Sequence, residues 1–415
     1  MKFSSVALLL LAGIVNANAA PLEDADSEEV PQIDEDLVPQ DNGTHLVPRA
    51  HGKKFSLDQV TNGHYKQPDG TTAMVQVFNK YKKPIPKKLK HALAAKKKAT
   101  NDKFKMKVGN MKGTASATPP QYYDSQYVVP VKIGTPPQTT YLNFDTGSSD
   151  LRLSGQTWSI VYGDGTGANG IVYTDRVQVG NTYVTKQAVQ SATEVSESIA
   201  RDKFSHGIVG LAFTSLNTVR PTVQKTYFDN VQKSLALPVF TANLQRGKAG
   251  NYNFGYINQG EYSGTIKFNT VDKGSPWWQF TVEGFQIGTG APYHKYKYSA
   301  IVDTGTTLLL VPNLIVTGYY RKVKGAKLDP KQGVWTFPCT SKLPDYYFGM
   351  GNYRGKVPGN YINYGRLTQD TCYGGIQSSD GIGFAILGDI LLKAQFVVFD
   401  LKTRSVGFAN KKTTK

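Results

Sequence analysis

Phe-Asp-Thr-Gly-Ser-Ser at residues 144–149 is repeated 158 residues further along the chain as Val-Asp-Thr-Gly-Thr-Thr at residues 302–307. Each copy places one aspartate, Asp145 or Asp303, in a turn that follows a run of β-prone residues. The glycine two residues later allows the backbone to turn sharply beside the carboxylate. One such tripeptide is usually only a turn, but two copies on matching strands indicate a duplicated lobe.

A duplicated lobe would bring Asp145 and Asp303 together on a pseudo-twofold axis. Two carboxylates held that close do not both ionise, so they share a proton. One of them can then activate a water molecule while the other protonates the substrate. The repeat therefore predicts hydrolysis of peptide bonds without a metal ion or a covalent intermediate.

A second repeat consists of His-Gly-Ile-Val-Gly-Leu at residues 206–211 and Phe-Ala-Ile-Leu-Gly-Asp at residues 384–389. With these motifs the chain resembles the pepsin-like aspartic proteases, in particular the secreted fungal acid proteases of the aspergillopepsin and penicillopepsin type. The resemblance covers roughly residues 122–409. Further matching phrases, in the same order, are Ile-Gly-Thr-Pro-Pro-Gln at 133–138, Tyr-Gly-Asp-Gly at 162–165, Tyr-Asn-Phe-Gly-Tyr-Ile at 252–257 and Val-Val-Phe-Asp at 397–400.

The composition fits a β-rich chain of two lobes. Its 415 residues suffice for two cores, and 41 glycines separate short runs rich in tyrosine and phenylalanine. We expect a mostly β fold, and the resemblance implies two pseudo-twofold-related lobes with the active site in the cleft between them. The expected divisions are a signal peptide at 1–19, a prosegment at 20–115, an N-terminal lobe at 116–285 and a C-terminal lobe at 286–415.

The two cysteines, Cys339 and Cys372, are predicted to form one disulfide in the second lobe, because the chain enters the secretory route. Two free, buried thiols are the alternative. The six histidines are scattered, and no cysteine–histidine cluster has the spacing of a metal site. We expect no metal ion and no other cofactor.

The N-terminus has the pattern of a secretory signal peptide. A lysine at position 2 precedes an apolar run at residues 6–15, and Ala-Asn-Ala follows at 17–19. The apolar run is too short to cross a bilayer, and no hydrophobic tail follows Phe408. We expect an exported protein without a membrane anchor, outside the cell or alternatively in the vacuole.

Residues 20–115 differ in charge from the rest of the chain. An acidic block of eight carboxylates at residues 23–36 is followed, at residues 53–112, by 16 lysines against three aspartates. A lysine-rich arm could bind nucleic acid or a membrane. The resemblance instead implies an inhibitory prosegment. Its Lys80 and Tyr81 match the family's Lys-Tyr pair, in which the ammonium sits between the two aspartates.

The lysine that enters the cleft is not settled by the sequence, because Lys82 and Lys83 are alternatives and all three could decorate an exposed helix. Candidate processing sites are the lysine runs at 53–54, 82–83 and 96–98. The only N-glycosylation sequon, at 42–44, lies in this removable part. Residues 116–415 carry a net charge of +11, so acid release is expected to depend on the cleft carboxylates. We favour a solvated basic surface over one that binds anionic polymers, and expect no nucleic-acid partner.

The resemblance assigns supporting roles around the two aspartates. The threonine after each aspartate bonds across the lobe interface. The hydroxyl three positions after each aspartate donates to the outer carboxylate oxygen and keeps one aspartate ionised. Ordinary turn caps are the alternative for these hydroxyls. The support residues are Thr146, Gly147, Ser148, Thr304, Gly305 and Thr306.

Residues 158–167 have the pattern of a strand with a glycine-rich hairpin tip, and they resemble the family's flap over the substrate. Tyr162, followed by Gly163, would wall the pocket for the side chain before the scissile bond. Asp164 would let that pocket accept lysine as well as large apolar residues. Ile199 stands where relatives have phenylalanine, which would make the pocket roomier.

One departure concerns the stretch before the flap. Only 17 positions separate Asp145 from Tyr162, whereas family members have considerably more residues there. Arg152 stands where the family has tryptophan. The missing stretch normally supplies a strand, a short helix and contacts that brace the flap. Either this is a genuine, less rigid variant, or the sequence comes from a gene model that lacks an exon segment.

Together these observations predict a secreted aspartic endopeptidase, made as a zymogen and active in acid on unfolded or loosely structured proteins. We expect a monomer that takes protein and peptide substrates and is inhibited by pepstatin-type inhibitors. The alternative is a catalytically silent protein of the same fold that only binds peptides or proteins. The two aspartates favour the enzyme, and the shortened first lobe favours the silent form.

Overall fold

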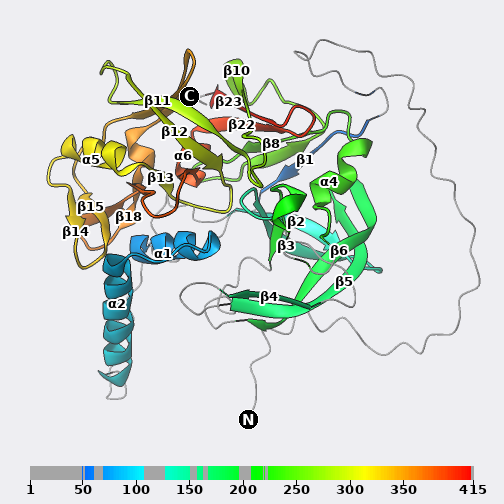
Figure 1. The fold of residues 1–415 in the computed structure, drawn as a ribbon, viewed down its shortest axis with the longest axis horizontal. Coiled ribbons are helices and arrows are strands. Elements are labelled where there is room, and N and C mark those ends of the chain that lie inside the picture. The colour runs from blue at the N-terminus through cyan, green and yellow to red at the C-terminus, as the bar shows by residue number, and fades with distance from the viewer. Residues whose placement is uncertain are drawn as a thin grey trace, which may run out of the picture.

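The computed structural model describes residue 49 and residues 52–59, 69–106, 127–149, 157–161, 167–195, 207–217, 219 and 223–412. Within these residues strands predominate, and they form two β-rich lobes (Figure 1). The mostly β, two-lobed fold expected from the sequence is confirmed. The predicted signal peptide and the acidic block lie outside the described residues.

The N-terminal lobe is built on a sheet in which β4, β5, β2, β3 and β7 are neighbours in that order and β6 pairs with β5. The buried Phe144 anchors the end of β3, so Asp145 leaves the sheet at a fixed position. β7 runs parallel to β3, with Phe144 opposite Val209. The strands are β2 (Val128–Ile133), β3 (Gln138–Asp145), β4 (Thr157–Val161), β5 (Gly167–Val179), β6 (Thr182–Val195) and β7 (Ile208–Gly210).

The C-terminal lobe repeats this arrangement in a seven-stranded sheet of order β17-β16-β11-β12-β21-β13-β20. β12 ends at the buried Val302, immediately before Asp303, and β21 runs parallel to it with Val302 opposite Leu387. β11 begins at Gln279, ahead of the expected lobe boundary at 286. The strands are β11 (Gln279–Ile287), β12 (His294–Val302), β13 (Leu309–Val311), β16 (Tyr346–Met350), β17 (Tyr353–Val357), β20 (Ile376–Ser378) and β21 (Ala385–Leu387).

A third sheet, of order β1-β9-β8-β22-β23-β10, joins segments from distant parts of the chain. Its aromatic core includes Phe240, stacked on Phe399 with ring centroids 4.4 Å apart. Such ring pairs contribute packing as well as apolar burial. The strands are β1 (Phe55–Asp58), β8 (Val239–Asn243), β9 (Asn251–Phe254), β10 (Tyr262–Thr270), β22 (Gln395–Asp400) and β23 (Ser405–Lys411).

A small sheet of order β14-β15-β19-β18 covers the outer part of the C-terminal lobe. Its strands are β14 (Lys327–Asp329), β15 (Val334–Pro338), β18 (Asn363–Arg366) and β19 (Thr371–Gly374). The short helices of the two lobes are α4 (Tyr227–Val231), α5 (Asn313–Arg321) and α6 (Asp389–Leu392), with 3-10 turns at Thr214–Leu216, Gln232–Ser234 and Gly359–Tyr361.

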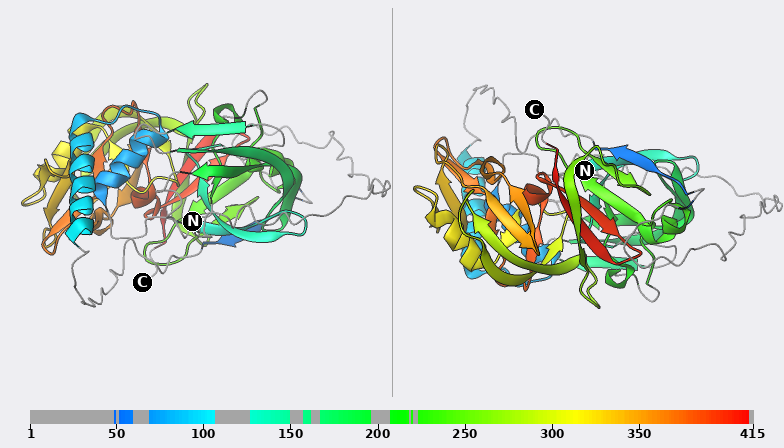
Figure 2. Two further views of the ribbon diagram at one scale, coloured as in Figure 1. Left: turned by 90° about the horizontal axis from the view of Figure 1, so that it is seen from below. Right: turned by 90° about the horizontal axis from the view of Figure 1, so that it is seen from above.

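Two helices precede the N-terminal lobe: α1 (Gly70–Lys80) and α2 (Lys87–Met106). α1 buries its apolar side chains, among them Met74 and Phe78, while α2 buries Leu89 near its start. In Figure 1, α1 runs beneath the C-terminal lobe towards the middle of the molecule, and α2 extends away from it; Figure 2 shows both helices from below. Among the described residues, no helix is both long and apolar enough to span a membrane.

Candidate active site

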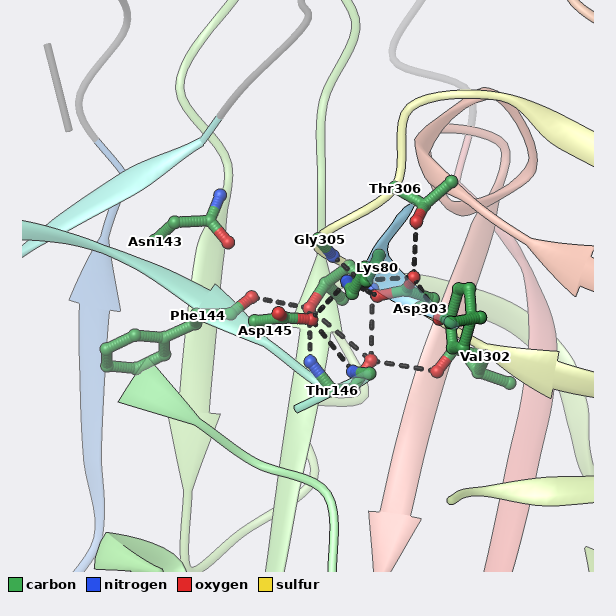
Figure 3. Close-up of polar contacts among 12 residues, drawn as sticks. Lys80, Asn143, Phe144, Asp145, Thr146, Val302, Asp303, Gly305 and Thr306 are labelled. Atoms are coloured by element: carbon green, nitrogen blue, oxygen red, sulfur yellow. Dashed lines mark hydrogen bonds and ion pairs between the residues drawn. The ribbon is translucent and has the colours of Figure 1, made fainter. Parts of the chain in front are cut away.

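Asp145 and Asp303 lie face to face at the ends of β3 and β12, where 2% and 0% of their surfaces are exposed. A single ammonium group bridges them (Figure 3): Lys80 Nζ is 2.8 Å from Asp145 Oδ1 and 2.9 Å from Asp303 Oδ1. Two segments that are 158 residues apart in sequence therefore form one buried acidic centre.

Thr146 and Thr304 fasten the two lobes to each other directly beneath the aspartates. The Thr146 backbone N–H donates to Thr304 Oγ1 over 3.1 Å, and the Thr304 N–H donates to Thr146 Oγ1 over 3.0 Å. Each hydroxyl also donates to a carbonyl of the opposite lobe, that of Val302 or Phe144. This reciprocal network holds the spacing of the two carboxylates, because neither turn can move without breaking buried hydrogen bonds.

The two turn glycines are required by close approach across the interface. Gly147 N–H donates to Asp145 Oδ1 over 2.8 Å, and Gly305 N–H donates to Asp303 Oδ1 over 2.9 Å. A Cβ on Gly147 would lie 2.6 Å from Asp303 Oδ1, and one on Gly305 would collide with the Asp145 carboxylate. Each glycine thus leaves room for the aspartate of the other lobe.

The hydroxyl side chains beside the two aspartates do not match. Thr306 donates to Asp303 Oδ2, as the resemblance implies. Ser148 differs from that expectation, because its buried hydroxyl has no hydrogen-bond partner among the described residues. Only its backbone is engaged, with the carbonyl accepting from Ala212. The hydroxyl support therefore serves one aspartate, Asp303, in this structure.

Lys80 and Tyr81, at the C-terminal end of α1, fill the space between the carboxylates. The Tyr81 hydroxyl donates to Asp303 Oδ2 over 2.5 Å. Its ring is packed edge-on against Trp277 and Phe384, with centroids 5.9 and 5.3 Å away. The structure places Lys80 at this position, whereas Lys82 and Lys83 follow in the turn after the helix and are not bound to the aspartates.

The buried charges shift the protonation of these groups in opposite directions. Burial, together with the neighbouring Asp303, raises the pKa of Asp145 even though Lys80 opposes this. Burial also acts to raise the pKa of Asp303, but Lys80 and the hydroxyls of Thr306 and Tyr81 lower it to about 2. Burial acts against the Lys80 charge, yet the two carboxylates raise the pKa of Lys80. One carboxylate of the pair is therefore the stronger acid.

The expected flap residues Tyr162, Gly163 and Asp164, and the expected pocket residue Ile199, lie outside the described residues. The strands that lead into and out of the tip are described: β4 pairs with β5, with Val161 opposite Gly167. A hairpin therefore stands at this position. The shortened stretch at 150–156 also lies outside the described residues.

Trp277 and Phe384 were not singled out from the sequence, although they form the wall against which Tyr81 packs. Both are half-buried, and their rings lie 5.1 Å apart. Trp277 follows Pro276 just before β11, and Phe384 opens the second repeated motif. The sequence shows that both positions are aromatic, but only the fold shows that the two side chains are in contact.

The predicted disulfide between Cys339 and Cys372 is present and closes a step of 33 residues. It links the end of β15 to β19 in the small outer sheet. A loop of this length contributes about 3–4 kcal/mol in the chain-entropy account of disulfide stabilisation. The disulfide therefore supports the outer part of the C-terminal lobe and does not touch the site.

The site has the groups needed for acid–base chemistry on an amide. A carboxylate with a lowered pKa and one with a raised pKa are buried together, with the Gly147 and Gly305 amides and Thr306 fixing their orientation. Such a pair can take a proton from water and deliver one to a leaving group. No cluster of three or more metal-ligating side chains occurs among the described residues.

Comparisons with known proteins agree with this geometry. The family model described as eukaryotic aspartyl protease matches residues 126–154 and 151–411. Endothiapepsin of Cryphonectria parasitica is 42% identical to the chain, over 86% of this chain and 90% of that protein. Podosporapepsin of Podospora anserina is 41% identical, over 90% and 96%. Penicillopepsin-1 of Talaromyces stipitatus is 44% identical, over 69% and 78%.

Among solved structures, the aspartic proteinase from Irpex lacteus superposes with a TM-score of 0.60 over 70% of this chain and 96% of that chain. Its sequence is 23% identical, so this likeness concerns the fold. The two segments matched by the family model overlap at residues 151–154. This overlap lies in the stretch between Asp145 and the hairpin.

Proposed function

This chain belongs to the eukaryotic aspartyl protease family and is an aspartic endopeptidase, and from that premise we propose that it is made as a zymogen, exported, and activated to cleave proteins in acid. Its substrates are proteins and peptides. The observation that carries the zymogen proposal is the position of the Lys80 ammonium between Asp145 and Asp303.

Lys80 blocks catalysis because its ammonium occupies the place that a reactive water needs. Asp303 Oδ1 and Oδ2 lie 2.9 and 3.0 Å from Lys80 Nζ. The Tyr81 hydroxyl donates a further hydrogen bond to Oδ2. A water held by both carboxylates cannot share this space. The upstream segment at residues 20–115 is then an inhibitory prosegment, and its removal leaves the two lobes at 116–285 and 286–415.

Once Lys80 and Tyr81 have left, the dyad performs general acid–base catalysis. Thr306 remains as a donor to Asp303, so Asp303 is the carboxylate that stays ionised and accepts a proton from the attacking water. Asp145, beside which the Ser148 hydroxyl makes no such bond among the described residues, supplies the proton to the substrate. The threonine network beneath them keeps both groups oriented throughout.

Acid weakens the inhibitory contact through the same pair. Asp145, whose pKa is raised, takes a proton first as the pH falls, and its attraction for Lys80 is then lost. The Asp303 contribution is fully present above the usual aspartate pKa and is lost only as the pH falls towards about 2. Activation is therefore expected in acid, with Asp145 as the first cleft carboxylate to respond.

Substrate preference follows from the expected flap. Tyr162 and Gly163 would cover the pocket before the scissile bond, Ile199 would enlarge it, and Asp164 would accept a lysine there beside large apolar residues. We further propose a monomer inhibited by pepstatin-type compounds. The signal peptide at residues 1–19 supports export to the outside of the cell, with the vacuole as the alternative destination.

The test is acid treatment of the purified full-length precursor with a protein substrate, with and without pepstatin. We expect pepstatin-sensitive cleavage that begins only after acidification, together with loss of mass from the precursor. The shortened stretch between Asp145 and Tyr162 favours a second candidate, a peptide-binding protein without catalysis. The peptide-binding candidate is supported if the acid-treated, folded protein binds pepstatin but leaves the substrate intact.

A further inference from the structure

An ion pair outside the site joins the two helices that precede the N-terminal lobe. Asp69 is the N-cap of α1 and accepts hydrogen bonds from the Thr72 backbone N–H over 3.2 Å and from the Thr72 hydroxyl over 2.9 Å. Lys96 of α2 places its Nζ 2.5 Å from Asp69 Oδ1. One carboxylate therefore caps α1 and ties it to α2.

The same ion pair rests on the C-terminal lobe. Lys96 Nζ donates to the Tyr373 hydroxyl over 3.3 Å, and that hydroxyl donates to Gln332 Oε1 over 3.0 Å. The Thr71 hydroxyl donates to the Gln332 carbonyl over 2.7 Å. The start of α1 is therefore held against β19 and the turn between β14 and β15. We call Asp69, Lys96 and Tyr373 the Asp69 latch.

We propose that the Asp69 latch is an acid sensor that controls how firmly α1 keeps Lys80 between the two aspartates. This inference deepens the proposed zymogen function and rests on it. α1 has 11 residues, with Asp69 immediately before its first turn and Lys80 in its last. Opening of the latch frees the start of the helix, and the helix carries the inhibitory lysine.

Asp69 supplies a charge that acid can remove and that lies outside the pair of cleft aspartates. The ion pairs described for residues 69–96 include those of Lys80 with Asp145 and Asp303, and that of Lys96 with Asp69. The chain beyond residue 116 is itself basic, with a net charge of +11. General loss of attraction between a basic segment and an acidic body is therefore not available as a trigger.

The groups that face Asp69 make the latch stable at neutral pH and cause it to open in acid. These are Lys96 from α2, Tyr373 from β19 and Tyr364 from β18, with Asp329 acting on Tyr373. Burial acts to raise the pKa of Asp69, but Lys96 and the Thr72 hydrogen bonds lower it overall. Stabilisation by the latch is thus complete above the usual aspartate pKa of about 4 and is lost as the pH falls through the lowered value.

Asp69→Asn tests the latch, because asparagine is as good an N-cap as aspartate but carries no charge. The measurement is hydrogen exchange of residues 70–80 in the intact precursor, corrected for the intrinsic pH dependence of exchange, with the mass of each sample checked for cleavage. At about pH 6 we expect exchange roughly three- to tenfold faster in Asp69→Asn than in wild type. The two proteins should converge only as the pH falls below the lowered pKa of Asp69, because the wild-type ion pair is lost there.

Lys96→Met should also accelerate exchange, and the double variant should show less than the sum of the two single changes, because both break the Asp69–Lys96 ion pair. The matched control is Asp345→Asn, which removes a comparable ion pair with Lys356, 2.8 Å long, on the C-terminal lobe. It should leave exchange of residues 70–80 unchanged. If Asp69→Asn did not fold, Lys96→Met would decide the question alone.

Wild-type exchange in Asp69→Asn or Lys96→Met at about pH 6, additive effects in the double variant, or an equal response to Asp345→Asn would each overturn the latch. Exchange requires no peptide cleavage, so the readout is independent of catalysis. A precursor that opens as described but never cleaves a substrate would count against the proposed zymogen enzyme and leave the latch standing.

Discussion

The two halves of the site start from the same Asp-Thr-Gly triplet but reach different electrostatic states. On the C-terminal side, Asp303 faces Lys80 and accepts from Gly305, Thr306 and Tyr81; Lys80 first, and then the Thr306 and Tyr81 hydroxyls, lower its pKa to about 2. On the N-terminal side, Asp145 accepts from Gly147, while the nearby Ser148 hydroxyl has no hydrogen-bond partner among the described residues, and burial raises the Asp145 pKa. Duplication provides matching backbones, while the Lys80 charge, the surrounding donors and burial set the protonation.

This difference has a direct chemical use. Two equivalent carboxylates would compete for one proton, whereas in the proposed mechanism unequal ones divide the roles of base and acid. The shared threonine network keeps the geometry symmetric while the outer donors make the charges unequal. Geometry and protonation are thus controlled by separate residues, and each can be tested separately.

The largest expected effect comes from removing either half of the pair. Asp145→Asn and Asp303→Asn should both abolish turnover, because neither role can be taken over by the other carboxylate. We expect losses of at least about 10²–10⁴-fold in kcat/KM. The assay uses precursor converted by added active enzyme, so that a failure to self-activate is not counted. Activity within tenfold of wild type in either variant contradicts the assignment.

The next effect concerns the hairpin that belongs to the first half only. Asp164→Ser should selectively weaken cleavage after lysine while sparing cleavage after phenylalanine or leucine, because it removes a carboxylate that would pair with the substrate ammonium. A partly desolvated pair changes the lysine-to-phenylalanine ratio by about five- to hundredfold. Competing peptide substrates measure this ratio directly. An unchanged ratio would assign Asp164 to the hairpin turn alone.

Removing the two outer hydroxyls compares the halves directly. Thr306→Val deletes a donor that lowers the Asp303 pKa, so the acid limb of the kcat/KM profile should move to higher pH by about one unit. Ser148→Ala should move it much less, since Ser148 makes no such bond here. Equal shifts from the two variants would show that the asymmetry disappears once Lys80 has left.

The smallest effect compares two strained residues, one just after the helix α1 that carries Lys80 and one in the turn between β22 and β23. Among the described residues, Lys82 and Arg404 are the non-glycine residues with positive φ, at 52° and 47°. Lys82 ends α1: its N–H donates to the Asn79 carbonyl, and the Lys83 N–H donates to the Phe78 carbonyl. A residue with positive φ at the end of a helix is usually glycine. Lys82→Gly should stabilise the precursor by about 1 kcal/mol and slow its conversion about fivefold.

Arg404→Gly is the control for this change, because Arg404 lies in the turn between β22 and β23, far along the chain from α1. It should alter the unfolding midpoint of the converted protein without slowing conversion. If both variants slow conversion equally, the strain at Lys82 has no special connection with the inhibitory helix.

The sequence predicted the features that depend on local pattern. Two hydrophobic strands ending in Asp-Thr-Gly sufficed to predict the pair of lobes, since the glycines and threonines have the same local task in each copy. The resemblance pointed to Lys80, but the residues alone left Lys82 and Lys83 open, because the choice depends on where α1 ends. The helix continues to Lys80 and turns at Lys82, and that boundary is set by packing against the lobes.

Other features were missed because they arise only from tertiary contacts. Trp277 and Phe384 are more than 100 residues apart and meet only around Tyr81. Asp69 is an ordinary helix cap in sequence, and its pairing with Lys96 depends on the angle between two helices. β11 begins at Gln279 because it pairs with β12 from later in the chain, a register that no local pattern determines.

Strand β1 affects the protein once conversion has taken place. Phe55–Asp58 forms the outermost strand beside β9, with Phe55 stacked on Phe254 at 5.0 Å. In the proposed conversion the upstream segment is removed, so the outward backbone groups of Asn251–Phe254 would lose their β1 partners and the Phe254 ring would lose its Phe55 neighbour. A bare sheet border of this kind is a template for self-association. The proposed conversion would therefore expose a sheet border at the same time as it opens the cleft.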